Sequence, residues 1–146
     1  RQIIDEARGA AEKKKIELSC MAEKELTITG DGFRLRQALE NVIYNGIRYC
    51  SEGCRVSCRI LKRQGEAHIM VEDNGPGIAP EDIPNLFERY YTGRRRNKGE
   101  GSGLGLSIAM ELVKAQGGTI TCTSQLSKGT VFDICLPLQD KEKIKK

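Results

Sequence analysis

Apolar residues recur along this chain with two different periods, and each period predicts one kind of secondary structure. Spacings of three and four residues, typical of one helix face, predict helices over residues 2–14, 33–50 and 103–116. Alternation with polar residues predicts strands over residues 16–20, 26–28, 55–63, 67–72, 119–124 and 130–136. We also expect a short helix over residues 80–91 and a basic loop over residues 92–103.

Short turns join most of the predicted strands, so neighbouring strands should pair mainly antiparallel. Helices that interleave with such hairpins can cover one face of a single sheet. The order of the elements therefore predicts an α/β two-layer sandwich. Its mixed, largely antiparallel sheet should have about five strands, with three main helices on one face.

Composition narrows the class of protein. The chain has 146 residues, enough for one domain with its own core, and 38% of them are hydrophobic and 30% charged, as in globular proteins. A net charge of +4 does not require a polyanionic partner, and 5% aromatic residues provide few stacking platforms for single-stranded nucleic acid. No stretch approaches the roughly 20 apolar residues that span a bilayer. Since Arg1 rather than methionine begins the chain, we expect it to be part of a longer protein.

The six cysteines form no C-x-x-C pair, and the single histidine, His68, lies at a distance from them in the sequence. This spacing argues against a zinc site. Several cysteines occupy positions where an apolar residue would fit, so we expect buried free thiols and a reducing compartment. We expect His68 to be a surface residue of its strand.

A polar stripe on the helix over residues 33–50 is the first group with candidate chemistry. Asn41, Asn45 and Arg48 are four and three residues apart, which places them on one stripe turned away from the apolar stripe. Amide oxygens are hard ligands suited to Mg²⁺, and a guanidinium suits phosphate oxygens. A helix with this stripe alone would simply have a solvated polar face.

Two glycine-rich segments extend this picture. Asp73-Asn74-Gly75-Pro76-Gly77 follows a strand, and its glycines would let the backbone approach a flat ligand while Asp73 accepts a hydrogen bond from an amine, such as that of adenine. By itself this segment could be an ordinary turn. Gly99–Leu106 opens a helix whose free N–H groups can cradle phosphates. This segment is not a dinucleotide-binding fingerprint, because a long basic loop rather than a strand precedes it. It is not a P-loop either, because no Gly-Lys-Ser/Thr follows.

Taken together, the motifs resemble those of the catalytic, ATP-binding domain of bacterial sensor histidine kinases, in the larger group with gyrase and the mismatch-repair ATPases. The resemblance covers roughly residues 1–138 and implies the Bergerat-type fold. The matching segments occur in the family's order. They are the asparagine box (39–49), the first glycine box (73–78), the phenylalanine box (86–91), the second glycine box (101–106), and a terminal box made of Gly117-Gly118-Thr119 and Gly129-Thr130.

The resemblance implies a role for residues around the base of the nucleotide. Asp73 would bind the adenine amine, with Thr130 and Gly77 nearby. Ile78 and Leu106 would line the adenine pocket. The other nucleotide-binding positions that it implies are Tyr49, Gly75, Phe87, Lys98, Gly101, Gly103, Leu104 and Gly105.

The resemblance also implies how the phosphates and the metal are held. Asn45 would hold Mg²⁺, Asn41 would support the metal or its waters, and Arg48 would contact phosphate, which makes these three the implied catalytic residues. Residues 79–103 would form a lid over ATP, with Phe87 anchoring its base. One basic lid residue would reach the γ-phosphate: Arg94, Arg95, Arg96 or Lys98.

Two departures from the wider group refine the expectation. Relatives that hydrolyse ATP place Glu where Asn41 stands, and an amide cannot act as a general base. The family's phosphoacceptor is a histidine followed by an acid on a dimerisation helix, whereas His68 lies in a predicted strand and is followed by Ile69. We therefore expect a catalytic module over residues 1–140, with a charged tail over 141–146, that lacks its own phosphoacceptor.

The expected function is to bind Mg-ATP and donate the γ-phosphoryl group to a histidine on a separate dimerisation domain. Two alternatives stay open: a serine-protein kinase of the anti-sigma-factor type, and a nucleotide-binding regulatory module without phosphotransfer. The expected partners are the dimerisation domain and a cognate response regulator, not nucleic acid. We expect a monomeric fragment from the cytoplasmic part of an inner-membrane sensor.

Overall fold

Three α-helices, one 3-10 helix and five strands make up the part of the chain that the structure describes. The computed structural model describes residues 2–22, 26, 28, 30–89 and 105–138. In chain order the elements are α1 (Gln2–Lys13), β1 (Glu17–Ala22), α2 (Gly32–Tyr49), β2 (Arg55–Arg63), β3 (Glu66–Asp73), η1 (Ile83–Asn85), α3 (Gly105–Ala115), β4 (Thr119–Gln125) and β5 (Gly129–Pro137).

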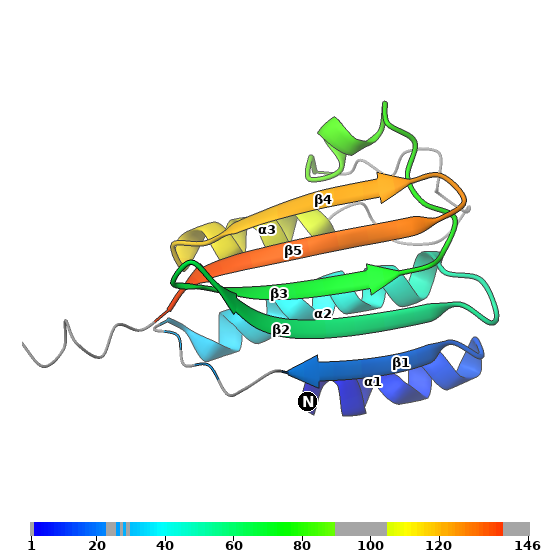
Figure 1. Cartoon of the computed structure of the whole chain (residues 1–146), viewed down its shortest axis with the longest axis horizontal. Helices are drawn as coiled ribbons and strands as arrows, with labels where there is room; N and C mark the ends of the chain where they lie inside the picture. Colours follow the sequence, from blue (N-terminus) through cyan, green and yellow to red (C-terminus); the bar gives the residue numbers. More distant parts are fainter. Residues whose placement is uncertain (1, 23–25, 27, 29, 90–104, 139–146) are drawn as a thin grey trace, which may run out of the picture.

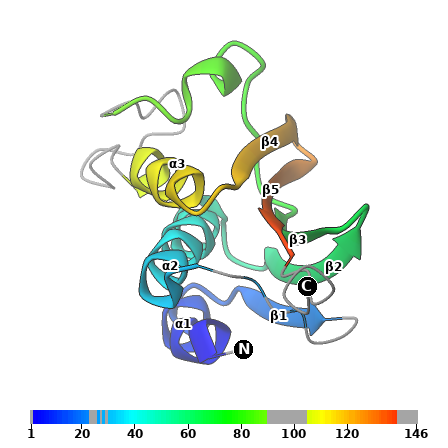
Figure 2. The same ribbon diagram turned by 90° about the vertical axis from the view of Figure 1, so that its left-hand side faces the viewer.

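The strands form one sheet in the order β1-β2-β3-β5-β4. β1 runs parallel to β2, and each of the other neighbouring pairs runs antiparallel. The helices α1, α2 and α3 lie together on one face of this sheet (Figures 1 and 2). The predicted two-layer sandwich with a mixed, largely antiparallel sheet is confirmed.

Local sequence explains where α2 begins and ends. The carboxylate of Asp31 caps the helix, because its Oδ1 accepts hydrogen bonds from the backbone N–H groups of Phe33 at 3.0 Å and Arg34 at 3.2 Å. The helix ends at Tyr49, and the extended backbone of the next residue, Cys50, still donates its N–H to the carbonyl of Gly46. This placement brings the C-terminal end of α2 to the same end of the sheet as the last residue of β3 (Figure 1).

The core lies between the helix layer and the sheet. Alternate residues of β5 point toward the helices, and Phe132, Ile134 and Leu136 are exposed by no more than 2%. Val42 of α2 and Val113 of α3 are fully buried against this layer. Each such side chain contributes about 1.5–3 kcal/mol relative to an exposed one, so this layer supports the end of the sheet where the site lies.

The prediction of a helix over residues 80–91 is wrong. Up to residue 89, the described part of this segment contains only the 3-10 turn Ile83–Asn85. The reason is Pro84, which has no N–H to donate to the carbonyl of Pro80 and whose ring would collide with that carbonyl in an α-helix. Residues 90 and 91 lie outside the described residues.

The strand expected over residues 26–28 is reduced to an isolated antiparallel bridge between Ile28 and Leu138, and Thr27 lies outside the described residues. The other predicted strands are confirmed to within about two residues at each end, the uncertainty normal for boundaries. Within the described ranges, no helix combines the length and apolarity that crossing a membrane requires.

All six cysteines are free thiols, and three of them, Cys50, Cys54 and Cys58, are buried as expected. The other three are partly exposed. Burial, together with the neighbouring Cys20, raises the pKa of the Cys58 thiol to about 12. Cys58 therefore behaves as a small apolar core residue at neutral pH.

Candidate nucleotide-binding site

Three elements bring their ends together at one end of the sandwich. These are the C-terminal ends of α2 and β3 and the N-terminal end of β5, at the right-hand side of Figure 1, and the N-terminal end of α3 is directed toward this side. Asp73, the last residue of β3, is paired in register with Thr130 of β5. The glycine-rich segments of the sequence follow β3 and precede α3, so most of the predicted site residues that the structure describes gather here.

Asp73 is the buried acid of this site, with 7% of its surface exposed. Its Oδ1 accepts the backbone N–H of Gly75 at 2.9 Å, so the turn after β3 helps to hold the carboxylate in place. Carboxylates are almost never buried without such partners. A fixed acceptor at the end of a strand can recognise an amine on a ligand.

The turn after Asp73 lies directly against the β4–β5 turn. Gly77 has a φ of +77°, and a Cβ there would overlap the backbone carbonyl of Gln125. The N–H of Ser127 donates to the carbonyl of Pro76 at 2.8 Å, and Ile78 at the end of the turn is fully buried. A side chain at position 77 would push the two turns apart.

Gly129 makes the second close approach. A Cβ on this residue would overlap the backbone carbonyl of Asp73. Since Gly129 also has a φ of +132°, no other residue type would fit there without strain. Together with Gly77, it fixes the position of Asp73 relative to β5.

Asn45 on α2 is buried, with 8% of its surface exposed, whereas Asn41 is half-buried and Arg48 is exposed. Asn45 is therefore the most buried of the three residues on the predicted polar stripe. The Asn45 Nδ2 atom is buried and makes no hydrogen bond within the described structure. A buried N–H donor without a partner is costly unless an acceptor, such as an oxygen of a phosphate, completes it, so Asn45 fits a role in holding a ligand.

The base of the predicted lid is attached through an aromatic contact. Phe87 meets Phe132 of β5 edge to face, with ring centroids 6.2 Å apart and an interplanar angle of 84°. The neighbouring Leu86 is buried. Phe87 thus joins the segment after η1 to the core of the sheet.

The remaining predicted residues divide into two groups. Leu106 packs partly buried against the core beside Gly105, the first residue of α3, and Tyr49 is half-buried at the end of α2. The rest of the predicted lid and second glycine box lies outside the described residues, namely Arg94, Arg95, Arg96, Lys98, Gly101, Gly103 and Leu104.

One polar residue of the site was not predicted. Ser124 of β4 accepts the N–H of Ile78 at 2.8 Å and lies 2.8 Å from the hydroxyl of Thr130. The available signal was its phase, since Ile120 and Cys122 place Ser124 on the side of β4 that faces the helices. A serine at an apolar phase, one residue before the strand ends, stands out from the exposed threonines of the same strand.

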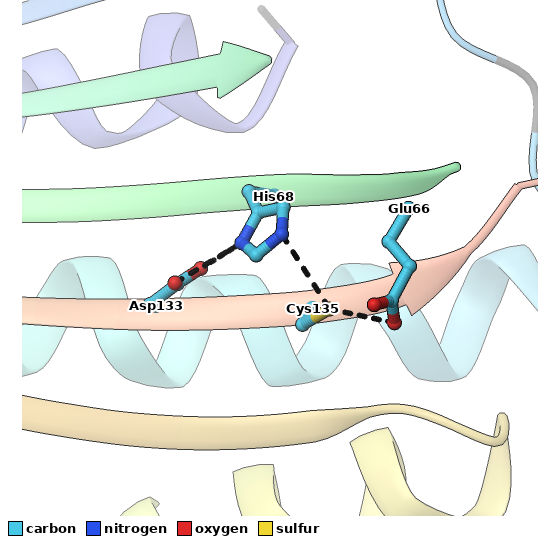
Figure 3. Close-up of polar contacts among 4 residues, drawn as sticks. All are labelled: Glu66, His68, Asp133 and Cys135. Carbon is cyan, nitrogen blue, oxygen red and sulfur yellow. Dashed lines mark hydrogen bonds and ion pairs between the residues drawn. The ribbon is translucent and has the colours of Figure 1, made fainter. Parts of the chain in front are cut away.

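A second polar cluster lies on the face of the sheet opposite the helices, at the other ends of β3 and β5 (Figure 3). His68 Nδ1 contacts the carboxylate of Asp133 at 3.0 and 3.1 Å, and the thiol of Cys135 donates to Glu66 at 3.0 Å. His68 is partly buried, with 19% of its side chain exposed, rather than a free surface residue. Among the described residues, no three such side chains are placed to hold a metal ion.

Comparison with known proteins connects this geometry to a family. Residues 30–140 match the family model described as "Histidine kinase-, DNA gyrase B-, and HSP90-like ATPase". The chain belongs to this ATPase family. The matched range contains α2, the turn after Asp73 and the start of α3.

The relatives place the chain with the catalytic ATP-binding domains of histidine kinases. It is 38% identical to "Sensor histidine kinase CusS" of Escherichia coli K12 over 138 residues, and 37% identical to "Sensor-like histidine kinase SenX3" of Mycobacterium tuberculosis H37Rv over 139 residues. These alignments cover 93% of the chain but only 28% and 34% of the relatives. The chain therefore spans about a third of the length of these curated relatives.

Solved structures agree with this family placement. "Mycobacterial sensor histidine kinase MprB" superposes with a TM-score of 0.83 at 28% identity, covering 94% of this chain and 95% of that one. Full-length ShkA in complex with AMPPNP gives a TM-score of 0.83 at 30% identity, covering 94% of this chain and 29% of that one. The ATPase-domain fold thus extends over nearly the whole chain.

Proposed function

We propose that this domain binds Mg-ATP and donates the γ-phosphoryl group to a histidine on a separate dimerisation domain. The observation that carries the proposal is the buried Asp73 carboxylate, held by Gly75 N–H at the end of the sheet where Asn45 of α2 also lies. This arrangement offers an acceptor for the base and an amide for the metal at the same end of the fold. The membership of the histidine kinase ATPase family supports the same reading.

Recognition of the base rests on Asp73 and the two turns beside it. The carboxylate would accept a hydrogen bond from the exocyclic amine of adenine. Gly77 would allow the backbone close to the ring, while Ile78 and Leu106 would supply apolar contacts to its faces. Thr130, paired with Asp73, would lie beside the same edge of the base.

Asn45 would hold Mg²⁺ through its amide oxygen, with Asn41 supporting the metal or its waters and Arg48 contacting phosphate. Mg²⁺ prefers oxygen ligands and keeps several waters, so one buried amide together with the phosphates is a suitable set. When bound, the metal would neutralise charge on the phosphates. The residues of this chain would then act mainly by positioning the nucleotide.

The presence of asparagine at position 41 favours phosphotransfer to an acceptor over hydrolysis of ATP. An amide has no lone pair basic enough to take a proton from water, so this chain lacks a general base at that position. We therefore infer that the isolated domain hydrolyses ATP slowly, and that the attacking nitrogen comes with the acceptor domain. The partners of the domain would be that acceptor domain and, downstream, a response regulator.

We infer further that residues 1–140 act as one monomeric catalytic domain with a charged tail, on the cytoplasmic side of an inner-membrane sensor. The share of the curated relatives that the chain spans, about a third, leaves ample length for the dimerisation and sensor parts of such a protein.

The test is phosphotransfer to an acceptor added in trans. The domain is incubated with ATP labelled at the γ-phosphate and with the dimerisation domain of the parent kinase as a separate polypeptide. Acid-labile label on the acceptor is expected, because the P–N bond of phosphohistidine is cleaved by acid. Acid-stable label would indicate a serine kinase, and no label despite nucleotide binding would favour a regulatory module.

A further inference from the structure

Ser124 connects three parts of the site through one hydroxyl group. Its Oγ lies 2.8 Å from the backbone nitrogen of Ile78, 2.9 Å from the carbonyl oxygen of Gly129 and 2.8 Å from Oγ1 of Thr130. Ile78 belongs to the turn after Asp73, whereas Gly129 and Thr130 begin β5. The hydroxyl of Ser124 on β4 therefore links the turn that follows Asp73 to the start of β5.

The direction of each of these hydrogen bonds follows from counting protons. A hydroxyl has one proton and two lone pairs. The Ile78 N–H can only donate, so it uses one lone pair of Ser124, and the Gly129 carbonyl can only accept, so it takes the single Ser124 proton. The contact with Thr130 must then use the second lone pair of Ser124. Thr130 is therefore the donor, and its own proton is directed toward Ser124.

We propose that Ser124 is a specificity-determining positioning residue, which holds the Thr130 hydroxyl so that it offers only lone pairs beside Asp73. This inference rests on the proposed function, because it assumes that the base of ATP binds at Asp73. Ser124 itself does not touch the nucleotide in this account. It acts through Thr130, which is 1% exposed and paired in register with Asp73.

With Thr130 held in this way, the edge of the site formed by Asp73 and Thr130 offers only hydrogen-bond acceptors. An ionised Asp73 carboxylate accepts hydrogen bonds, and Thr130 oriented by Ser124 also accepts. A 6-amino group on a purine can donate to this edge, directly or through a water oriented by Thr130. A 6-oxo group is itself an acceptor and cannot replace the amine as a donor to this edge, so the edge favours a 6-amino purine over a 6-oxo purine.

The test compares ATP with inosine triphosphate, which carries a 6-oxo group in place of the 6-amine, by calorimetric titration of the full chain. In Ser124→Ala, Thr130 loses its acceptor and its proton can turn toward the ligand. We expect the affinity for ATP to fall about tenfold, while that for inosine triphosphate falls much less, so the preference for ATP shrinks. Ser124→Thr, which keeps the hydroxyl, should retain the preference.

Thr123→Ala is the matched control, because Thr123 precedes Ser124 on the same strand and is exposed on the other face. It should leave both affinities unchanged. If Ser124→Ala weakens both nucleotides equally, or neither, Ser124 has only a structural role and the inference is overturned. Thermal unfolding of each variant shows whether it is folded.

Thr130→Val covers the case in which Ser124→Ala does not fold. It removes the acceptor while Ser124 stays in place, and the preference for ATP should again shrink. An unchanged preference in this variant would also overturn the inference. If the unsubstituted chain binds neither nucleotide, the proposed function fails instead, which keeps the two failures distinguishable.

Discussion

At the scale of single residues, Asn45 is the best test of how the metal is held, because its buried amide carries the oxygen that we propose as the Mg²⁺ ligand. Asn45→Ala should reduce the gain in ATP affinity that Mg²⁺ provides by about tenfold or more, the effect of losing one interaction with a charged group. Calorimetric titration with ATP, with and without Mg²⁺, measures this gain.

Gln37→Ala is the control for this variant, since Gln37 is an exposed amide two turns earlier on α2. It should leave the effect of Mg²⁺ unchanged. An Asn45→Ala variant with the full effect of Mg²⁺ would show that the metal is held elsewhere.

The thiol of Cys135 provides a prediction about pH on the opposite face of the sheet (Figure 3). Burial, followed by the hydrogen bond to Glu66, raises the pKa of Cys135 to about 11, so the thiolate forms only at high pH. Alkylation of Cys135 by iodoacetamide, followed by peptide mass spectrometry, should therefore accelerate with a midpoint near pH 11. Glu66→Gln should move this midpoint down, because it removes the negative charge beside the sulfur.

Glu72→Gln is the control for Glu66→Gln, because Glu72 is an exposed carboxylate of β3, the strand that also contains Glu66. It should leave the alkylation midpoint of Cys135 in place. A midpoint near the ordinary thiol value of about 8.5 in the unsubstituted protein would contradict the account of this cluster.

The sequence was informative for residues whose type is unusual at their position. Asp73 lies at a strand end in the phase of the apolar residues Ala67, Ile69 and Val71, and glycines follow it. These residues could be selected because their chemistry contrasts with the local pattern. The burial of Asn45 could not be predicted, because it depends on how α2 packs against its neighbours. Ser124 was missed because its role depends on hydrogen bonds to residues that are close only in the folded chain.

At the scale of elements, periodicity located the three helices and most of the strands, since each has a face that packs against the core. The segment over residues 80–91 was misjudged because favourable residues at its start outweighed Pro84 in the prediction. The pairing of β1 with β2 in a parallel orientation was also not predictable, because no turn between them fixes the register. Neighbours in the sheet were predictable only where a hairpin joins them.

The contact between the turn after β3 and the β4–β5 turn leads to a prediction at this scale. Gly77→Ala should place a methyl group on the carbonyl of Gln125 at a φ of +77°. We expect the free energy of unfolding to fall by about 1–3 kcal/mol and ATP binding to weaken, because Asp73 and Ile78 shift with the turn. Thermal unfolding and nucleotide titration measure the two effects.

Gly9→Ala is the matched glycine control. Gly9 lies exposed within α1, where an added Cβ meets nothing within 4 Å. Because alanine is the better helix former, this variant should be more stable by about 0.5–1 kcal/mol and should bind ATP normally. Equal effects of the two substitutions would show that the turn contact has no special role.

At the scale of the whole molecule, the fold places chemically different residues from distant parts of the sequence at one end of a rigid sheet. Asn45 lies near the C-terminal end of α2, Asp73 ends β3 and Thr130 is the second residue of β5. The corresponding ends of these three elements lie at one end of the sheet (Figure 1). The sheet order, with β5 between β3 and β4, makes the pairing of Asp73 with Thr130 possible. A module built in this way can hold a nucleotide while the acceptor is supplied by another domain.

The most direct test of this account is a calorimetric titration of the chain with ATP in the presence of Mg²⁺, alongside Asp73→Ala and Asp133→Ala. Asp133 is a matched control, because its carboxylate lies on the face of the same sheet opposite the helices, in contact with the His68 ring (Figure 3). The account predicts saturable one-to-one binding that Asp73→Ala abolishes and Asp133→Ala preserves. Undiminished ATP binding by Asp73→Ala, or no binding by the folded, unsubstituted chain, would contradict it.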